Sequence, residues 1–134
     1  MEITVVKEQS KSGTPVTVLQ VAGKTDSASA GKLQQKAFEL IDAGARYLII
    51  DLGQVPYMSS AGLRVLQEVF NKLRQLSSDE SDKETYRKIT DGSYQFPYLK
   101  IVNLTKEVLE VLKMAGFDML VPIEKDVKRA LASI

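Results

Sequence analysis

Two short apolar segments open the chain, and a polar turn separates them. Residues 3–6 and 16–22 are rich in β-branched side chains, which are enriched in strands. The SGTP sequence at 12–15 combines residue types that favour tight turns. The pattern therefore predicts an antiparallel β-hairpin at the start of the chain.

Apolar residues at helical spacing predict the next two helices. The first helix spans about 28–44, and its apolar face consists of Leu33, Ala37, Leu40 and Ile41. The second helix has an apolar face made of Leu63, Leu66, Phe70, Leu73 and Leu76. Between the two helices, the continuous apolar run at 47–52 is typical of a strand that is covered on both faces of a parallel sheet.

The last third of the chain continues this alternation. A strand is predicted at 99–104, and Thr105 stands where it can cap a third helix that ends near Gly116. A short last strand is predicted at 119–122, before a helix whose apolar face consists of Val127, Ala130 and Leu131. The order favours right-handed crossovers and predicts an α/β fold, with a mixed, mostly parallel sheet, an N-terminal antiparallel hairpin, about five strands and about four helices.

Residues 77–95 interrupt the alternation. Their sequence, SSDESDKETYRKITDGSYQ, is polar and has neither helical nor strand periodicity. We therefore expect a polar insertion at about 77–96 that forms a solvated loop or a mobile segment, with a specific docking element as the alternative. The strand predicted after it is needed to complete the same sheet, so residues 1–134 are expected to form a single domain.

The composition removes most catalytic chemistry. The chain has 134 residues and contains neither Cys nor His, so disulfides, thiolate zinc sites, cysteine nucleophiles and the commonest general base are missing. Lys and Arg number 18 and Asp and Glu 17, a net charge of +1 that gives no electrostatic preference for nucleic acid. A binding or regulatory role is favoured over an enzyme, and no catalytic residue, cofactor, metal or nucleic-acid partner is expected.

The chain also lacks the usual signals for export or membrane insertion. The first residues, MEITVVKEQS, have neither the basic region nor the apolar core of a secretory signal. Every unbroken apolar run is far shorter than the roughly 18 residues that span a bilayer. A cytoplasmic location without direct membrane insertion is therefore expected.

The segment DLGQVPYMSSAGLRVL at 51–66 carries the most specific pattern. It runs from the end of the apolar strand to two serines, Ser59 and Ser60, directly before a helix. Ligands and partners of α/β sheets bind at the carboxyl ends of strands, although a serine in this position commonly just caps the helix. A serine hydrolase is excluded because GxSxG and His are missing, and a P-loop because GxxxxGK[ST] is missing.

The same segment resembles the signature of STAS domains, the family of anti-sigma factor antagonists. In that family a strand ending in Asp-Leu leads through a Met to Asp/Ser-Ser-Ser/Ala-Gly-Leu at a helix start. The stretch VAGKTDSASAGKL is similar to the family's Gly-x-x-Asp segment. The stretch VLKMAGFDMLVPIEKDVKRAL is similar to its C-terminal helix, Gly turn, short strand and final helix. The resemblance covers nearly the whole chain except 77–95.

The resemblance implies a phosphorylation switch. The residue that is phosphorylated in the family corresponds to Ser60, and Ser59, at a position that many members fill with Asp, is the second choice. The unphosphorylated protein would bind an anti-sigma factor, often itself a serine kinase. Phosphorylation would abolish this binding and a serine phosphatase would restore it. The chain would be the substrate and not the catalyst, and monomeric on its own.

The expected surroundings of the phosphorylation site are Asp26, Met58, Ser59, Ala61, Gly62 and Arg64. Asp26 matches an acidic position of the family, but an Asp also commonly caps a helix such as the one that follows it. Gly62 is unfavourable in a helix and is explained either by close approach of a partner or by packing. Tyr57 and Met58 could form an exposed contact surface or pack inside the loop. Arg64 could pair with a phosphate or lie in solvent.

A function from a different class stays open at this point. STAS domains also resemble the cytoplasmic parts of anion transporters and of lipid-transport complexes, so the chain could be a soluble accessory subunit of such a membrane system. In that role the serines need only cap the helix. A nucleotide-binding sensor has no phosphate-binding motif in its favour.

Overall fold

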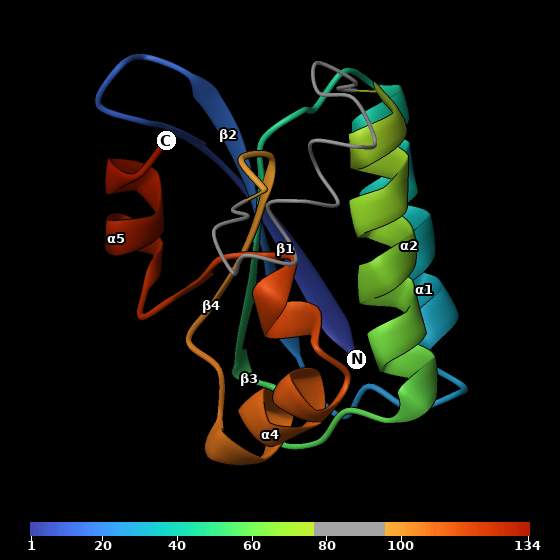
Figure 1. Ribbon diagram of the computed structural model, residues 1–134. Helices are drawn as coiled ribbons and strands as arrows, with labels where there is room; N and C mark the ends of the chain where they lie inside the picture. The colour runs from blue at the N-terminus through green and yellow to red at the C-terminus, as the bar shows by residue number, and fades with distance from the viewer. Residues whose placement is uncertain (77–95) are drawn as a thin grey trace.

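The computed structural model describes residues 1–76 and 96–134 of the chain, and its strands form one sheet (Figure 1). The strands are β1 (Glu2–Gln9), β2 (Pro15–Ala22), β3 (Leu48–Gln54), β4 (Leu99–Val102) and β5 (Ile123–Glu124). The helices within these residues are α1 (Ala30–Asp42), α2 (Ser60–Leu76), α4 (Lys106–Met114) and α5 (Val127–Ala132), with a short 3-10 helix, η1 (Phe117–Met119), after α4. The expectations for 77–95 lie outside the described residues.

The strands follow one another across the sheet in chain order, β1-β2-β3-β4-β5. β1 and β2 pair antiparallel, and the pairs β2/β3, β3/β4 and β4/β5 are parallel. The expected mixed, mostly parallel sheet with an N-terminal hairpin is therefore confirmed. This topology places the carboxyl ends of β2, β3 and β4 at the same end of the sheet, where the loops to α1, α2 and α4 begin.

Helices cover both faces of the sheet (Figure 1). Side chains of α1, α2 and α4 belong to the larger core cluster, and α5 contributes to a smaller cluster on the other face. In β3, Leu48 and Ile50 face the larger cluster, whereas Ile49 faces the smaller one, and all three are buried. The apolar residues at 47–50 are thus explained by a strand that is covered on both sides.

The end of the chain differs from the predicted strand at 119–122. Gly116, with a φ of 72°, starts a tight turn in which the two residues after η1 donate their N–H groups to the Phe117 carbonyl at 3.0 and 3.1 Å. Because both N–H groups have their acceptor within the turn, the segment forms a turn and not an extended strand. Contact with β4 begins at the end of this segment, where the Ile101 N–H donates to the Pro122 carbonyl at 3.2 Å, and strand pairing follows in β5, where Ile123 lies beside Ile101.

Two further boundaries differ from expectation. The strand predicted at 99–104 ends at Val102, because Asn103 adopts a left-handed backbone with a φ of 61°, which ends the extended run. Phe96 closes the range expected to be a solvated insertion, yet it is buried, with its ring centroid 4.7 Å from that of Phe70. Phe96 therefore does not belong to the solvated segment predicted at 77–95, although it ends the range of about 77–96 given for the insertion.

Candidate functional site

Two loops at the carboxyl ends of the parallel strands form the candidate site. One follows β3 and leads to α2, and the other follows β2 and leads to α1 (Figure 1). The Thr25 N–H donates to the Tyr57 carbonyl at 3.0 Å, and the Ser59 N–H donates to the Thr25 carbonyl at 2.8 Å. Thr25 and Met58 thereby form a parallel bridge. The structure thus brings the segment that contains Asp26 next to the segment that contains the serines.

The two serines occupy different environments. Ser59 is half-buried, its Oγ accepts a hydrogen bond from the Gly62 N–H at 3.4 Å, and its carbonyl accepts one from the Leu63 N–H at 3.0 Å. It is therefore the N-cap of α2. Ser60 is the first residue of α2 and is exposed, and its hydroxyl has no hydrogen-bond partner among the described residues. One serine holds the helix start, and the other presents its hydroxyl to solvent.

Gly62 lies where α2 packs most tightly against the loop after β2. A Cβ at this position would lie 2.6 Å from Thr25 Cγ2 and 2.8 Å from Met58 Cγ, closer than side chains can approach. Met58 is buried at 3% exposure, whereas Tyr57 is 53% exposed. Packing therefore explains the glycine, and only Tyr57 of the neighbouring pair offers apolar surface to a partner.

Asp26 closes the turn that precedes α1. Its Oδ1 accepts hydrogen bonds from the N–H groups of Ala28 and Ser29, both at 3.0 Å, and the Ser29 hydroxyl also lies 3.0 Å away. The bonds from Ser29, its N–H first and its hydroxyl second, hold the pKa of Asp26 below the ordinary value, so the carboxylate is charged at neutral pH. The geometry thus makes Asp26 a turn residue before α1, whose N-cap is Ser29.

The start of α2 carries no carboxylate. Its first turn contains no acidic residue, so the positive end of the helix is not neutralised there. Ala61 packs partly against the core, and Arg64 is exposed one turn along the helix. Ser60 therefore presents an exposed hydroxyl in a field that favours an anion.

Two threonines that the sequence did not single out as site residues support these loops. Thr25 is fully buried, and its Oγ1 has no hydrogen-bond partner within the described part of the chain. Thr105 caps α4 as predicted, accepting from the Val108 N–H at 3.3 Å. Its hydroxyl also donates to the Val55 carbonyl at 3.4 Å and so joins the start of α4 to the loop before α2. A threonine before a helix indicates the cap, but no sequence pattern indicates the second bond.

The described residues also show what the site lacks. Across 1–76 and 96–134, His, Cys, Asp and Glu side chains do not gather in groups of three or more that could hold a metal ion. Every helix in those ranges is too short or too polar to cross a lipid bilayer. The functional groups that the site offers are hydroxyls, backbone N–H groups and the carboxylate of Asp26, which hydrogen bonds hold in place.

Comparison with known sequences decides the family. The profile of the STAS domain matches residues 7–79, a range that includes both loops and both serines. The chain belongs to the STAS domain family. It is also 30% identical over 111 residues to BtrV of Bordetella bronchiseptica, which is named as a candidate anti-sigma factor antagonist, and this match covers 83% of the chain and 79% of BtrV.

Solved structures share the STAS fold over almost the whole chain. An anti-sigma factor antagonist from Mycobacterium paratuberculosis superposes with a TM-score of 0.67 at 20% identity, covering 97% of this chain and 92% of that one. The Bacillus cell fate determinant SpoIIAA, in its phosphorylated form, superposes with a TM-score of 0.62 at 12% identity, covering 96% of each chain. At such identities the likeness establishes the fold, and the chemistry must come from the residues of this chain.

Proposed function

We propose that this STAS domain is an anti-sigma factor antagonist whose binding to its partner is switched off by phosphorylation of Ser60. The observation that carries the proposal is the difference between the serines: Ser59 caps α2, whereas Ser60 exposes its hydroxyl at the first residue of the helix. The similarity to BtrV supports the antagonist role. SpoIIAA, known in unphosphorylated and phosphorylated forms, supports a phosphorylation switch in this fold.

The partner in this proposal is an anti-sigma factor that is itself a serine kinase. The unphosphorylated domain sequesters the anti-sigma factor and frees the sigma factor, and a serine phosphatase restores this state after phosphorylation. In this role the chain is the substrate of the kinase and not the catalyst. It acts as a single-domain monomer in the cytoplasm, without a cofactor.

The switch works through charge and bulk at the binding surface. A phosphoserine adds about −1.5 to −2 charges at pH 7. The first turn of α2 has no carboxylate to repel this charge, and helix N-termini stabilise anions, so the helix tolerates the modification. Ser59 keeps its capping bond to Gly62. The fold is retained, and the partner meets a charged group in place of a neutral hydroxyl.

Intact-mass spectrometry of the full chain, after incubation with ATP and lysate of the source cells, tests the proposal. Wild type and Ser59→Ala should each gain one phosphate, and Ser60→Ala should gain none. Because Ser59 supplies the cap, Ser60→Ala should change the free energy of unfolding by less than about 0.5 kcal/mol. It should bind the kinase partner in a pull-down whether or not ATP is present.

Other outcomes would contradict the assignment. Phosphate on Ser60→Ala but not on Ser59→Ala would move the site by one residue. An absence of phosphate on wild type, together with a pull-down that recovers only subunits of an anion or lipid transport system, would instead support the accessory-subunit role, in which both serines are structural.

A further inference from the structure

The serine loop, residues 55–59 between β3 and α2, lies between two other loops at the carboxyl ends of the parallel strands. One is the β2 loop, residues 23–29, and the other is the β4 loop, residues 103–105. Because β3 pairs with β2 on one side and with β4 on the other, the serine loop has one of these loops on each side. The two neighbours hold it by different kinds of contact.

The β2 loop holds its neighbour through backbone groups. The Gly23 N–H donates to the Gln54 carbonyl at 2.9 Å, at the end of β3. The backbone of Thr25 bonds to both Tyr57 and Ser59. Backbone groups are present whatever the side chain, so these bonds do not depend on the identity of one residue.

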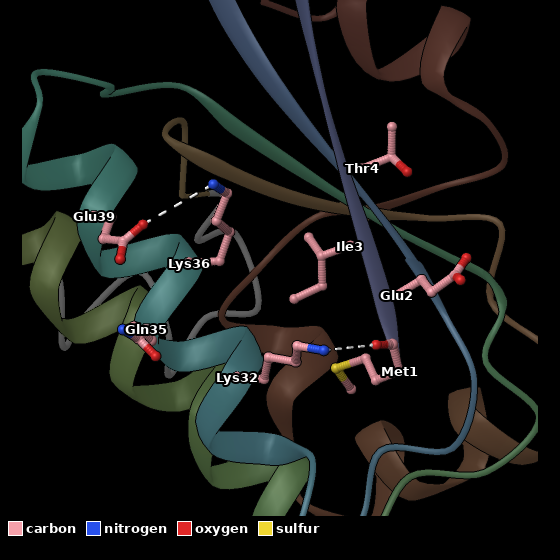
Figure 2. Close-up of a pocket in the computed structure, with 8 residues that line it drawn as sticks. All are labelled: Met1, Glu2, Ile3, Thr4, Lys32, Gln35, Lys36 and Glu39. Carbon is pink, nitrogen blue, oxygen red and sulfur yellow. Dashed lines mark hydrogen bonds and ion pairs between the residues drawn. The ribbon is translucent and has the colours of Figure 1, made fainter.

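The β2 loop is itself braced by the start of the chain. A Cβ on Gly23 would lie 3.3 Å from Met1 Cα, which places the first residue against this loop. Lys32 Nζ donates to the Met1 carbonyl at 3.3 Å and so ties the start of β1 to α1 (Figure 2). Several contacts therefore hold the serine loop and its support on this side.

The β4 loop approaches the serine loop at a sharp turn of the chain. Asn103 has a φ of 61°, a left-handed backbone that asparagine adopts more readily than most residues. Gly53 of β3 faces this turn, because a Cβ there would lie 3.1 Å from the Asn103 Cβ and 3.5 Å from its carbonyl oxygen. The ends of β3 and β4 therefore lie in close contact, and Thr105, two residues after the turn, reaches the serine loop.

Thr105 makes the one hydrogen bond that joins the β4 loop to the serine loop in the described ranges, 1–76 and 96–134. Its hydroxyl donates to the Val55 carbonyl at 3.4 Å and accepts a bond from the Val108 N–H at 3.3 Å. Val55 is fully buried, so water cannot replace the bond to its carbonyl. The hold on this side of the serine loop thus depends on a single side chain.

We propose that Thr105 is a positioning residue for the phosphorylation of Ser60. Its hydroxyl fixes the serine loop against the start of α4, and the serine loop in turn sets the place where α2 begins. The role rests on the phosphorylation proposed above, and it adds a residue that touches neither the phosphate donor nor the phosphate.

Phosphoryl transfer is sensitive to such positioning. The Ser60 Oγ forms a bond to the γ-phosphorus of ATP, and the bond from this phosphorus to the oxygen shared with the β-phosphate breaks. ADP leaves, and a base of the kinase takes the hydroxyl proton. The attacking and leaving oxygens must lie roughly in line. A misplacement of about 1 Å can cost on the order of a hundredfold in rate, so a shift of the serine loop should slow the reaction without unfolding the domain.

Substitutions of Thr105 separate the two bonds of its hydroxyl. Thr105→Ser keeps both bonds. Thr105→Asp keeps the cap of α4, because aspartate is a preferred N-cap, but its carboxylate cannot donate to the Val55 carbonyl. Thr105→Val keeps the shape of the side chain, adds no charge and loses both bonds. The bond to Val55 is therefore the feature that the aspartate and valine variants both lack.

The test measures the initial rate of phosphate uptake by the full chain, by intact-mass spectrometry, with ATP and lysate of the source cells. Thr105→Asp and Thr105→Val should each be phosphorylated about tenfold more slowly than wild type, and Thr105→Ser at close to the wild-type rate. Leu112→Val loosens the core under α4 about two turns after Thr105 and leaves the bond to Val55 in place. As the control for stability, it should also keep the wild-type rate.

Amide hydrogen exchange of the unphosphorylated variants adds a measurement that needs no kinase. The Val55 amide bonds to the Leu52 carbonyl at 3.0 Å, within the segment that Thr105 holds. Relative to the Ile50 amide in the middle of β3, its exchange should be at least about threefold faster in Thr105→Asp and Thr105→Val. It should not change in Thr105→Ser or Leu112→Val.

The possible failures are distinguishable. Wild-type rates in both Thr105→Asp and Thr105→Val would overturn the role of Thr105, as would a serine variant as slow as either. A loss in only one of the two would assign the effect to charge or to the cap of α4, and an equal loss in Leu112→Val would assign it to stability; each result contradicts the proposal. No phosphate on wild type would instead contradict the function on which the proposal rests.

Discussion

Helices α1 and α2 begin in neighbouring loops at the same edge of the sheet, yet their starts are built differently. Before α1, the charged carboxylate of Asp26 accepts two backbone N–H groups. Before α2, the neutral hydroxyl of Ser59 accepts one, and no acidic residue follows in the first turn. Neither helix has an acidic residue in its first turn, but the turn that leads into α1 contains the carboxylate of Asp26, whereas the start of α2 can gain an anion only by modification. This contrast explains why a phosphate would act at α2.

The largest expected effect comes from the glycines in the two first turns. A Cβ on Gly31 would meet nothing within 4 Å, whereas a Cβ on Gly62 would lie 2.6 Å from Thr25 Cγ2. Gly62→Ala should therefore destabilise the chain by about 1 to 3 kcal/mol through overpacking. Gly31→Ala, the matched control, should stabilise it by about 0.4 to 1 kcal/mol. Urea unfolding of both variants measures this difference, and stabilisation by both would show that α2 does not pack tightly on Thr25.

A smaller effect is expected at the buried hydroxyl of Thr25. Thr25→Val keeps the shape of the side chain and removes an Oγ1 that has no partner in the described residues, so it should stabilise the chain by about 1 kcal/mol. Thr25→Ser keeps the hydroxyl and removes the methyl group that contacts α2, so it should destabilise the chain. Thermal unfolding compares the two variants. Destabilisation by valine would mean that the hydroxyl is bonded in solution.

The carboxylate of Asp26, which precedes α1, should make the stability of the protein depend on pH. The pKa of Asp26 is lowered in the folded state, so its stabilising contribution is present above the unfolded pKa, about 3.9, and is lost as the pH falls through the folded pKa. Asp26→Asn should therefore be less stable than wild type at neutral pH, and the two should converge in acid. The pH dependence of the thermal midpoint measures this, and parallel curves would show that the carboxylate is not held by Ser29.

The smallest effect is expected at Arg64. If a phosphate on Ser60 pairs with this exposed guanidinium, Arg64→Ala should lower the thermal midpoint more in the phosphorylated protein than in the unphosphorylated one. The additional loss in free energy of unfolding should be less than about 1 kcal/mol. Far-UV spectra of the four samples should superimpose, and the phosphate should abolish partner binding in both proteins. Equal effects in the two forms would rule out the pairing. A large spectral change on phosphorylation would contradict a local switch.

Periodicity predicted most of the fold because the elements bury continuous apolar faces. It failed at 119–122, since a turn and a strand can have the same apolar sequence, and the hydrogen bonds that form the turn go to the Phe117 carbonyl. It also missed Phe96, because a single buried aromatic residue has no periodic neighbours. Such residues are recognised only by what they contact.

The features of the candidate site also divide into those that the sequence predicts and those that only the folded structure shows. The resemblance to the family singled out Ser59 and Asp26, and the structural roles of both before a helix were the alternative that capping chemistry predicts. It left two explanations for Gly62, because the side chain that excludes a Cβ belongs to Thr25, far away in the chain. The bond from Thr105 to the Val55 carbonyl is hidden for the same reason. Roles that depend on neighbouring residues could be predicted from the sequence, whereas contacts between loops that are distant in the sequence could not.

The sheet order β1-β2-β3-β4-β5 has a consequence for how the protein is made. Each strand that leaves the ribosome finds its neighbour already synthesised, so the chain can fold progressively, with few contacts that wait for distant segments. The bridge between Thr25 and Met58 and the start of α2 lie within the first half of the chain, and the bond from Thr105 to the Val55 carbonyl is added later. We therefore expect the serine loops to acquire their structure early in translation, before β4, β5 and α5 complete the domain.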